Sequence, residues 1–340
     1  MSKIIFPAEW YPQSGVQVTW PHANTDWFDI LEEVTACYVS FCKEILKREK
    51  LLVVCRNEDD ILKYFTKEEQ KNLLFASAKC NDTWARDHGA ISVFMDNKPT
   101  ILDFRFNAWG LKFAANYDNQ ITRHLVDEEI FQSEVVYKNV QNFVLEGGAI
   151  ESDGQGTLLT TSACLTAPNR NQPMELADIE YFLMRNLGAS KVLILNHGYL
   201  AGDDTDSHID TLARFCNDNT ITYVSCEDEN DEHFDELKEM ENELRSFETT
   251  EGKPYHLIPL PMADAVFEEG YRLPATYANF LIINGAVLMP TYGSNKDEIA
   301  KRQIAKAFPD REIIGVDCRP LIKQHGSLHC VTMQFPKGFL

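Results

Sequence analysis

Five short stretches of the sequence place ionisable side chains beside apolar residues or glycines, where each one costs free energy unless it is paired or used. The five stretches are Trp84-Ala-Arg-Asp-His-Gly89, Phe106-Asn-Ala-Trp-Gly110, Phe143-Val-Leu-Glu-Gly-Gly148, Asp203-Asp-Thr-Asp-Ser-His-Ile-Asp210 and His325-Gly-Ser-Leu-His-Cys330. Between them they hold a cysteine, several histidines and carboxylates, and two tryptophans. These residue types can supply a nucleophile, a proton donor and acceptor, and anionic ligands for a cation.

Taken singly, most of these residues also have structural interpretations. Arg86 and Asp87 could form an ion pair, Glu146 could cap a helix or a turn, and Cys330 could be an ordinary buried thiol. The carboxylates and the histidine of the fourth stretch could bind zinc or manganese. A hydrolytic metal centre usually needs a second clustered histidine, and within these five stretches His88 is the only other histidine next to a carboxylate. The sequence therefore favours a site without a metal.

Hydrolysis of a guanidinium would use these groups together. The delocalised cation resists attack at its central carbon, and a neutral amine leaves poorly. Carboxylates would hold the planar cation through paired hydrogen bonds, a thiolate would attack, and a histidine would protonate the departing ammonia and then activate water. The sequence offers Cys330 as the thiol, His208 as the acid and base, and the carboxylates of Asp87, Glu146 and Asp210. His208 and Asp210 are two residues apart, so we expect an extended segment that points both side chains to one face.

Strands and helices must position these groups. Short strands are predicted at residues 16–20, 51–55, 90–95, 100–104, 158–163, 191–195, 221–225, 256–260 and 312–316. Apolar residues with helical spacing predict helices near residues 25–46, 174–186, 231–247 and 296–308. Strands alternating with helices indicate the α/β class.

Turn residues add two hairpins to this pattern. Asp153-Gly154 marks the first, within residues 148–159, and Asn284-Gly285 marks the second, within residues 280–290, where the turn needs positive φ. Adjacent hairpins argue against a purely parallel, doubly wound sheet. The sequence has no Gly-x-Gly-x-x-Gly and no Walker loop, so it gives no support for nucleotide binding.

Composition restricts the partners. The 340 residues include 52 acidic and 32 basic side chains, and the formal net charge of −20 opposes binding to nucleic acid or anionic membranes but suits a small cationic substrate. No apolar run approaches the roughly 20 residues of a membrane span, and the apolar stretch before Pro7 is too short for a signal peptide, so we expect a cytoplasmic protein. Nine cysteines without a Cys-x-x-Cys pair predict reduced thiols. A homodimer is expected from the general frequency of such assemblies alone.

Taken in order, the motifs resemble those of the agmatine deiminase family, which includes the bacterial peptidylarginine deiminase type. The resemblance rests on Trp84-Ala-Arg-Asp-His-Gly89, Phe106-Asn-Ala-Trp-Gly110, Glu146-Gly-Gly148, Asp204-Thr-Asp-Ser-His-Ile-Asp210 and Leu328-His-Cys-Val-Thr-Met-Gln334, and it begins at Pro7-Ala-Glu-Trp10. It implies a single catalytic domain over residues 1–340 with a pentein fold, an α/β propeller of about five pseudo-symmetric ββαβ-type modules around a central pocket. It also implies that the protein needs no metal and no organic cofactor.

The resemblance further implies roles for individual residues. Cys330 would be the nucleophile and His208 the general acid and base, whereas Glu146 would orient His208 and bind a guanidinium nitrogen. Asp87 and Asp210 would clamp the remaining nitrogens. The far end of the substrate would meet acidic and aromatic residues, for which the candidates are Asp204, Trp84 and Trp109.

The reaction expected from the resemblance converts agmatine into N-carbamoylputrescine and ammonia through a covalent thiouronium on the cysteine, as a step in polyamine synthesis. No second basic cluster is placed to receive an α-carboxylate, which disfavours free arginine, although Arg86 could reverse this preference. Deimination of peptidylarginine or arginine is the near alternative. An amidinotransferase and a catalytically inactive guanidino-binding protein are more remote. The stretches His325-Gly-Ser-Leu-His329 and Met333-Gln334 depart from the family's common motifs, which bears on the substrate more than on the reaction.

Overall fold

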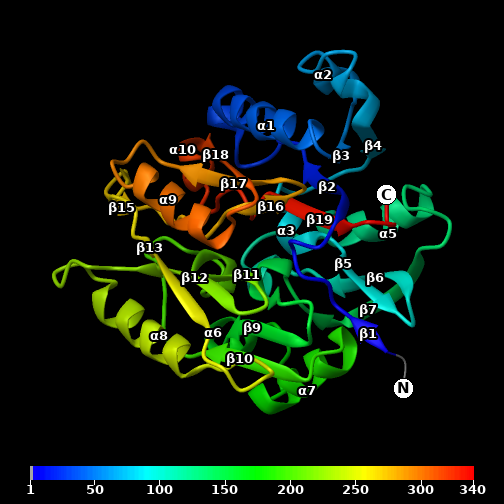
Figure 1. The fold of residues 1–340 in the computed structure, drawn as a ribbon. Coiled ribbons are helices and arrows are strands. Elements are labelled where there is room, and N and C mark those ends of the chain that lie inside the picture. The colour runs from blue at the N-terminus through cyan, green and yellow to red at the C-terminus, as the bar shows by residue number, and fades with distance from the viewer. Residues whose placement is uncertain (1–2) are drawn as a thin grey trace.

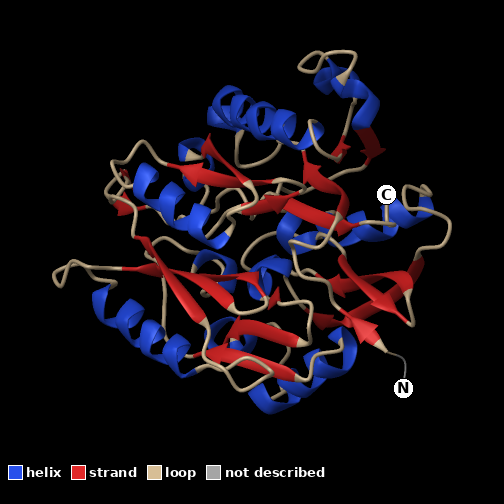
Figure 2. Ribbon diagram, in the orientation of Figure 1, coloured by secondary structure: helices blue, strands red, loops and turns tan. Residues whose placement is uncertain are grey.

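The structure is a computed structural model that describes residues 3–340. Strands and helices alternate along the chain (Figure 2), which confirms the α/β class. The α-helices are α1 (Leu31–Leu46), α2 (Asp59–Leu62), α3 (Ala85–His88), α4 (Ala108–Leu111), α5 (Ile121–Asp127), α6 (Ser162–Thr166), α7 (Leu176–Leu187), α8 (Phe234–Ser246), α9 (Asp297–Ala307) and α10 (Arg319–Ile322). Short 3₁₀ turns are η1 (Phe28–Ile30), η2 (Glu69–Asn72), η3 (Asp118–Gln120), η4 (Gly147–Ala149) and η5 (Ile209–Thr211).

The strands form separate small sheets. One four-stranded sheet contains, in spatial order, β19 (Thr332–Pro336), β2 (Gln13–Thr19), β3 (Lys50–Cys55) and β4 (Leu73–Ser77). A second contains β1 (Ile4–Ile5), β5 (Ile91–Met95), β6 (Lys98–Arg105) and β7 (Val136–Val144). Three more contain β8 (Glu151–Ser152), β9 (Thr157–Thr161) and β10 (Lys191–Leu195); β11 (Ala213–Asn217), β12 (Thr220–Ser225) and β13 (His256–Pro261); and β16 (Leu281–Ile283), β17 (Ala286–Thr291) and β18 (Glu312–Asp317). A two-stranded ribbon contains β14 (Phe267–Glu268) and β15 (Tyr271–Arg272).

Five of the sheets share one pairing pattern, an antiparallel pair followed by a parallel pair. It runs through β19-β2-β3, β5-β6-β7, β8-β9-β10, β11-β12-β13 and β16-β17-β18. In Figure 1 these sheets follow one another around the middle of the molecule, with α1, α7, α8 and α9 on the outside. Strand β19 near the C-terminus pairs with β2 near the N-terminus, Thr332 opposite Val18, so the two ends of the chain complete one sheet.

Strand β3 illustrates why a continuous apolar run forms a strand here. Leu51 and Val53 belong to one buried apolar cluster, whereas Leu52 and Val54 belong to another. Successive side chains of a strand point to opposite faces, and β3 is paired on both edges, to β2 and β4. Both faces are therefore buried, which explains a run without polar alternation.

Both predicted hairpins are confirmed, as β8–β9 and β16–β17. In the second turn Gly285 has φ +74°, whereas Asn284 does not have positive φ. The predicted strand 158–163 was too long, because it ends at Thr161. The Thr161 hydroxyl accepts a hydrogen bond from the Cys164 backbone N–H and caps α6, which stops the strand.

The expectation of an extended segment between His208 and Asp210 was wrong. Asp206 and Ser207 have φ of +67° and +65°, and a 3₁₀ turn follows directly after His208. The Asp203 carboxylate accepts a hydrogen bond from the Ser207 backbone N–H at 2.8 Å, which turns the chain back on itself. The two side chains therefore reach the site from a turn rather than from a strand.

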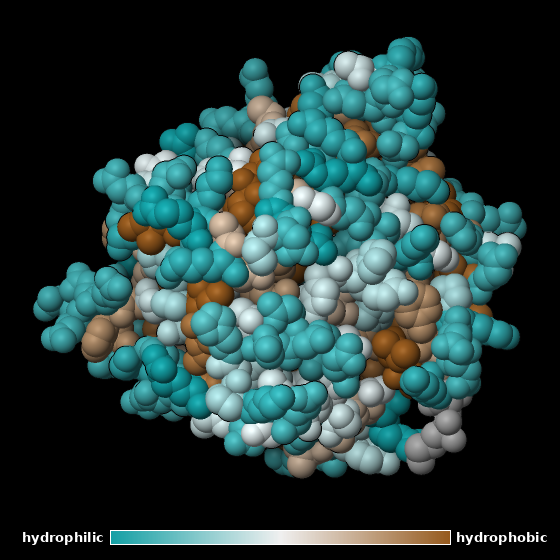
Figure 3. Space-filling view, viewed as in Figure 1, coloured by the Kyte–Doolittle hydropathy of each residue, from teal (hydrophilic) through white to brown (hydrophobic). Residues whose placement is uncertain are grey.

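Hydrophilic residues cover most of the face drawn in Figure 3, with single apolar residues scattered among them. Within residues 3–340, none of the helices combines the length and the apolar composition needed to cross a membrane.

Candidate active site

A cavity of about 470 Å³ has Cys330 and Asp87 in its wall. Its charged lining is acidic, since the carboxylates belong to Asp26, Asp82, Asp87, Asp118, Asp203 and Asp204 and the lining contains no lysine or arginine. Its aromatic lining consists of Trp84, Phe106, Trp109 and Phe113. An acidic and aromatic cavity of this kind attracts an organic cation and disfavours an anion.

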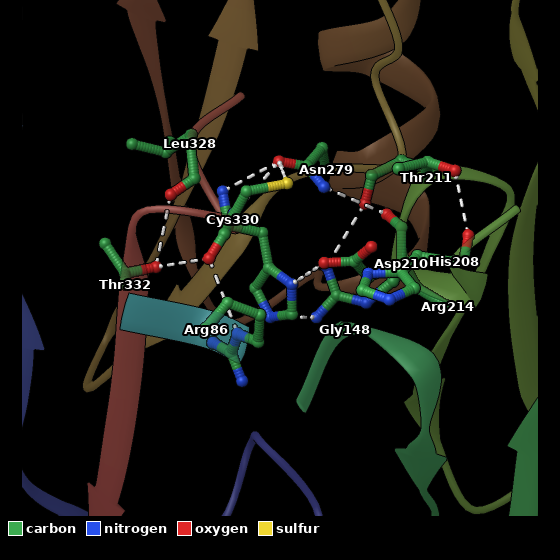
Figure 4. A network of polar contacts seen from close by, with 12 residues as sticks. Arg86, Gly148, His208, Asp210, Thr211, Arg214, Asn279, Leu328, Cys330 and Thr332 are labelled. Atoms are coloured by element: carbon green, nitrogen blue, oxygen red, sulfur yellow. Dashed lines mark hydrogen bonds and ion pairs between the residues drawn. The ribbon is translucent and has the colours of Figure 1, made fainter. Parts of the chain in front are cut away.

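Cys330 lies in the segment between α10 and β19 and is 5% exposed. Its Sγ lies 3.4 Å from Asn279 Oδ1, which also accepts a hydrogen bond from the Cys330 backbone N–H at 3.3 Å (Figure 4). Burial, and then the negative charges of Asp210 and Asp87, raise the pKa of the Cys330 thiol well above its ordinary value. The thiol therefore keeps its proton until a cation beside it offsets these effects.

Asp87 is held in one orientation by two donors. Its Oδ1 accepts a hydrogen bond from the Gly148 backbone N–H at 3.1 Å, and its Oδ2 accepts one from Trp109 Nε1 at 3.0 Å. Burial raises the pKa of Asp87 to about 6, and the charges of Asp210 and Glu146 act in the same direction. A fixed carboxylate at the cavity wall is suited to receive guanidinium nitrogens.

His208 is buried beside Asp87, with Nδ1 3.6 Å from Asp87 Oδ1. Burial would lower the pKa of His208, but Asp87, Cys164 and Glu146 raise it to about 10. The His208 ring is therefore protonated on both nitrogens and positively charged at neutral pH. Neither ring nitrogen has a hydrogen-bond partner within the described residues, so the protein leaves both ring N–H groups without an acceptor.

Gly148 allows these groups to converge. A Cβ atom at this position would lie 2.5 Å from His208 Nδ1, 2.9 Å from Asp87 Oδ1 and 3.2 Å from Asp210 Oδ2. Only glycine permits this approach, which explains one of the two glycines after Glu146. The structure thus gathers the predicted acid and base and two predicted clamp residues around one backbone position.

Glu146 lies beside His208 but already has a cationic partner. Its two carboxylate oxygens accept hydrogen bonds from Arg170 Nε at 3.0 and 3.2 Å, and Arg170 Nη1 also donates to Asp206 Oδ2 at 2.7 Å. One ligand atom each of Glu146, His208 and Cys164 lie within 4.8 Å of one another. Sequence reasoning missed both Arg170 and Cys164, which follow the strand β9 in a stretch without a chemical motif.

Asp210 is the most enclosed of the predicted clamp residues. His329 Nδ1 donates to its Oδ2 at 2.7 Å, whereas its Oδ1 has no partner within the described residues. Asn279 Nδ2 lies 3.4 Å from the Asp210 backbone oxygen (Figure 4), so one amide side chain contacts both Asp210 and Cys330. Asn279 was not predicted, and nothing local in the sequence distinguishes it.

The residues predicted for the far end of the substrate all line the cavity. Trp84 Nε1 donates to Asp82 Oδ2 at 3.1 Å, and Trp109 has left-handed backbone dihedrals, φ 54° and ψ 47°. The Asp204 backbone oxygen accepts a hydrogen bond from Lys112 Nζ at 2.6 Å. Asp26, Asp82 and Asp118 of the wall were not predicted, because they come from segments far apart in the sequence.

Arg86 does not line this cavity, which removes it as a partner for an α-carboxylate there. Within residues 3–340 it forms no ion pair with Asp87; its Nε lies 3.4 Å from the His329 backbone oxygen instead. The interpretation of Arg86 and Asp87 as a structural pair was therefore wrong.

The residues considered for a metal do not converge. Asp206 pairs with Arg170 and Lys112, whereas Asp210 faces His329. Two other groups of suitable side chains occur in the described chain, Glu146 with Cys164 and His208, and Glu9 with Glu151 and His329. In both groups an arginine already forms ion pairs with the carboxylates, Arg170 in the first and Arg214 in the second.

Comparisons with known proteins extend over nearly the whole chain. The family profile described as Porphyromonas-type peptidyl-arginine deiminase matches residues 5–336. A Legionella pneumophila (strain Paris) protein, provisionally named agmatine deiminase, is 32% identical over 98% of this chain and 95% of its own length. A Porphyromonas gingivalis structure, provisionally assigned as an arginine deiminase, is 54% identical with a TM-score of 0.96, covering 99% of this chain and all of the other.

Two further structures extend these similarities. A variant of C. jejuni agmatine deiminase with substrate bound is 39% identical with a TM-score of 0.93, covering 100% of this chain and 98% of the other. Dimethylarginine dimethylaminohydrolase, at 13% identity and a TM-score of 0.51 over 95% of this chain and all of the other, shares the fold alone.

Proposed function

The chain belongs to the Porphyromonas-type peptidyl-arginine deiminase family, and we propose that it hydrolyses the guanidino group of agmatine to N-carbamoylputrescine and ammonia. Family membership confirms the resemblance expected from the five motifs and makes the chain a hydrolase of guanidino C–N bonds. The choice of agmatine and the covalent route through Cys330 are our proposals.

One observation carries the proposal: His208, Asp87 and Asp210 converge on Gly148 in the neighbourhood of the cavity that Cys330 lines. A guanidinium is planar and presents several N–H donors, so several fixed carboxylates can accept hydrogen bonds from it at once. The same cation would stabilise the thiolate, which burial and the charges of Asp210 and Asp87 disfavour. Substrate binding and activation of the nucleophile are then one event.

The proposed reaction proceeds in two halves. The cation binds, the Cys330 thiol loses its proton to solvent, and the thiolate attacks the guanidinium carbon. The protonated His208 donates to one nitrogen, which leaves as ammonia while Cys330 keeps a thiouronium. The now neutral His208 accepts a proton from water, and the hydroxide adds to the same carbon. As the C–S bond breaks, the added hydroxyl becomes the ureido carbonyl and its proton passes to the departing sulfur, which restores the Cys330 thiol.

Glu146 is proposed to fix His208 for these proton transfers and to bind a substrate nitrogen. Its pairing with Arg170 supports the first role, because the carboxylate is then both charged and immobile. Asp87, held by Trp109 and Gly148, and Asp210, with its free Oδ1, are proposed to hold the remaining nitrogens.

The acidic wall supports agmatine over arginine. Agmatine carries an amine at its far end, which suits Asp204 and the neighbouring aspartates, with Trp84 and Trp109 packing along the chain of the substrate. Free arginine would bring a carboxylate into a cavity without lysine or arginine in its lining. Deimination of arginine or peptidylarginine remains the second candidate, because the Porphyromonas gingivalis relative is provisionally assigned as an arginine deiminase.

We further propose that the five similarly paired sheets are the modules of a propeller. The repeated pairing pattern of five sheets supports five modules of a propeller within a single domain of residues 1–340. A cytoplasmic location and a homodimer rest on the sequence expectations given above.

The test is ammonia release by the purified protein with agmatine, free arginine and an arginine-containing peptide in parallel, each with and without chelator. We expect rapid, chelator-insensitive turnover of agmatine, and slow or no turnover of the others. Preference for arginine or peptide would overturn the substrate, and no ammonia from any of the three would overturn the reaction.

A further inference from the structure

His329 directly precedes Cys330 and takes no part in the reaction proposed above. Its ring is buried, 1% exposed, and bridges two carboxylates. Nδ1 lies 2.7 Å from Asp210 Oδ2, and Nε2 lies 2.8 Å from Glu9 Oε2. Residues more than 300 positions apart in the sequence, Glu9 and His329, are thereby joined behind the cavity.

The geometry determines which ring atoms carry hydrogen. A carboxylate only accepts hydrogen bonds, so two ionised carboxylates require both nitrogens of His329 to donate. Burial would raise the pKa of Glu9, but Arg214 and His329 lower it far below its ordinary value, so Glu9 is ionised and cannot donate. Arg214 Nη2, 3.1 Å from Nε2, has Glu9 Oε2 as its own acceptor at 2.7 Å. Hydrogen bonds to both carboxylates then require an N–H group on each nitrogen of the ring.

The charges around this ring come from several elements. The groups that face it are Asp210 of η5, Glu9 of the N-terminal segment, Arg214 of β11, Glu151 of β8, and Arg86 of α3, whose Nε reaches the His329 backbone oxygen. Arg214 is shared between Glu9 and Glu151. Among these groups it is the His329 ring that makes direct side-chain contact with Asp210.

We propose that His329 is a positioning residue: as a charged imidazolium fixed by Glu9, it holds Asp210 ionised and oriented, with Oδ1 free for the substrate. The unpartnered Oδ1 of Asp210, in a side chain that is fully buried, is the atom that this arrangement leaves for a ligand. The inference rests on the proposed function, since it gives Asp210 a cation to hold.

The electrostatics agree with this role. Burial alone would raise the pKa of Asp210, but the hydrogen bond and charge of His329, followed by the charges of His208 and Arg214, bring it below its ordinary value. Without the imidazolium, Asp210 would take up a proton at a higher pH and lose one of its acceptor sites. Asp210 would then bind a guanidinium more weakly at the acidic end of the pH range.

His329 also shares an anchor with the nucleophile. Asn279 Oδ1 accepts hydrogen bonds from the backbone N–H groups of His329, at 2.9 Å, and Cys330, at 3.3 Å. A disturbed backbone would lower activity at every pH, whereas loss of the ring charge changes its pH dependence. The pH profile therefore separates the two effects.

The first experiment compares kcat/KM from pH 5 to 9 for the unmodified protein, His329→Gln and the control His197→Gln. Glutamine keeps a donor beside Asp210 but removes the charge. His197 also faces a carboxylate, Glu236, but lies partly exposed at the surface beside α8. We expect the acid limb of His329→Gln to become steeper and to lie at higher pH, because the pKa of Asp210 then rises toward that of Asp87, and that of His197→Gln to stay in place. A loss of equal size at every pH would overturn the proposal.

The second experiment does not depend on turnover. Nitrogen-15 NMR of histidine-labelled protein at pH 8 should show that the His329 ring carries hydrogen on both nitrogens. The same signal should persist in His208→Asn, which removes the charged ring of His208. A single proton on the His329 ring would overturn the inference even in an active enzyme. If no guanidino compound is turned over, the proposed function fails, and the protonation of this ring still decides whether its charge was inferred correctly.

Discussion

The indole Nε1–H of Trp109 donates a hydrogen bond to Oδ2 of Asp87 over 3.0 Å. The donor comes from a short segment in which Ala108, Trp109 and Leu111 all have positive φ, so the backbone is bent to bring the indole to the carboxylate. The other oxygen of Asp87 is fixed by Gly148. One clamp residue therefore owes its orientation to two segments that are remote from it in sequence.

Trp109→Phe should keep an aromatic wall but remove this donor. A hydrogen bond to a charged group contributes about 1.5–3 kcal/mol, so kcat/KM should fall by about 10- to 100-fold, and the acid limb should move upward as the pKa of Asp87 rises further. Steady-state kinetics from pH 5 to 9 measure both. Tyr137→Phe is the control, because it removes an aromatic donor to the carboxylate of Asp103 outside the cavity. Unchanged kinetics in Trp109→Phe would show that the bond does not orient the reacting carboxylate.

Cys330→Ser should lower kcat by several orders of magnitude while leaving agmatine binding measurable, because the nucleophile is lost but the carboxylates remain. Calorimetry gives the binding, and acid-quenched mass spectrometry of the unmodified protein should detect the thiouronium on this residue. Cys42→Ser, another buried thiol but in α1, is the matched control and should keep its activity. Ammonia release by Cys330→Ser at the unmodified rate would remove this residue as nucleophile.

Some of this site could be predicted from sequence because its residues stand in unusual local settings. Glu146 ends an apolar run, Cys330 follows a glycine-containing stretch, and His208 and Asp210 stand in a dense polar stretch, so their types and order indicated chemistry. The partners that fix them could not be found in this way. Arg170, Asn279 and Glu9 gain their roles from contacts made only after folding, and a single arginine or asparagine in a loop is usually no more than a solvated polar residue.

The strands were predictable where burial determines their composition. Leu51–Val54 is apolar because both of its faces are covered, and such a run needs no knowledge of its neighbours to be recognised. The turn before Asp210 was not predictable, since the positive φ of Asp206 and Ser207 depends on the Asp203 carboxylate folding back onto the chain. A two-residue spacing fits a strand equally well, and sequence alone does not distinguish the two.

Gly148→Ala should leave the protein folded but lower kcat/KM by at least about 100-fold, because a misplacement of the order of 1 Å at a reacting group has effects of this size. Its Cβ would lie 2.5 Å from His208 Nδ1 and 2.9 Å from Asp87 Oδ1, so both must move. Steady-state kinetics and circular dichroism are the measurements. Gly315→Ala in β18, whose Cβ would meet one methyl group of Thr291, is the control. Full activity in Gly148→Ala would mean that these side chains are not held in their reacting positions.

The proton on His208 should make stability depend on pH. The pKa of His208 is raised from 6.5 to about 10 in the folded protein, so its contribution is fully present below pH 6.5 and is lost as pH rises toward 10. Between pH 6.5 and 10 the unfolding free energy of the unmodified protein should fall by on the order of a few kcal/mol more than that of His208→Asn. Urea unfolding at several pH values measures this.

This pH window lies above the titration of Asp87, whose pKa is raised to about 6. His197→Asn, at the partly exposed pair with Glu236, serves as the control and should follow the unmodified protein. Parallel curves for the unmodified protein and His208→Asn would contradict the charged state assigned to the buried ring.

Asp204→Asn tests how the cavity recognises the far end of the substrate. Asp204 is one of the residues that line the acidic wall, and its backbone oxygen accepts a hydrogen bond from Lys112 Nζ. A partly exposed charge pair with the agmatine amine contributes about 0.2–1 kcal/mol, so KM for agmatine should rise by up to about five-fold with kcat nearly unchanged, and the difference should shrink at high salt. Asp228→Asn, exposed between β12 and α8, changes the net charge equally and should leave KM unaltered. An equal rise in both variants would assign the effect to overall charge, whereas an unchanged KM in Asp204→Asn would place the amine against other aspartates of the wall.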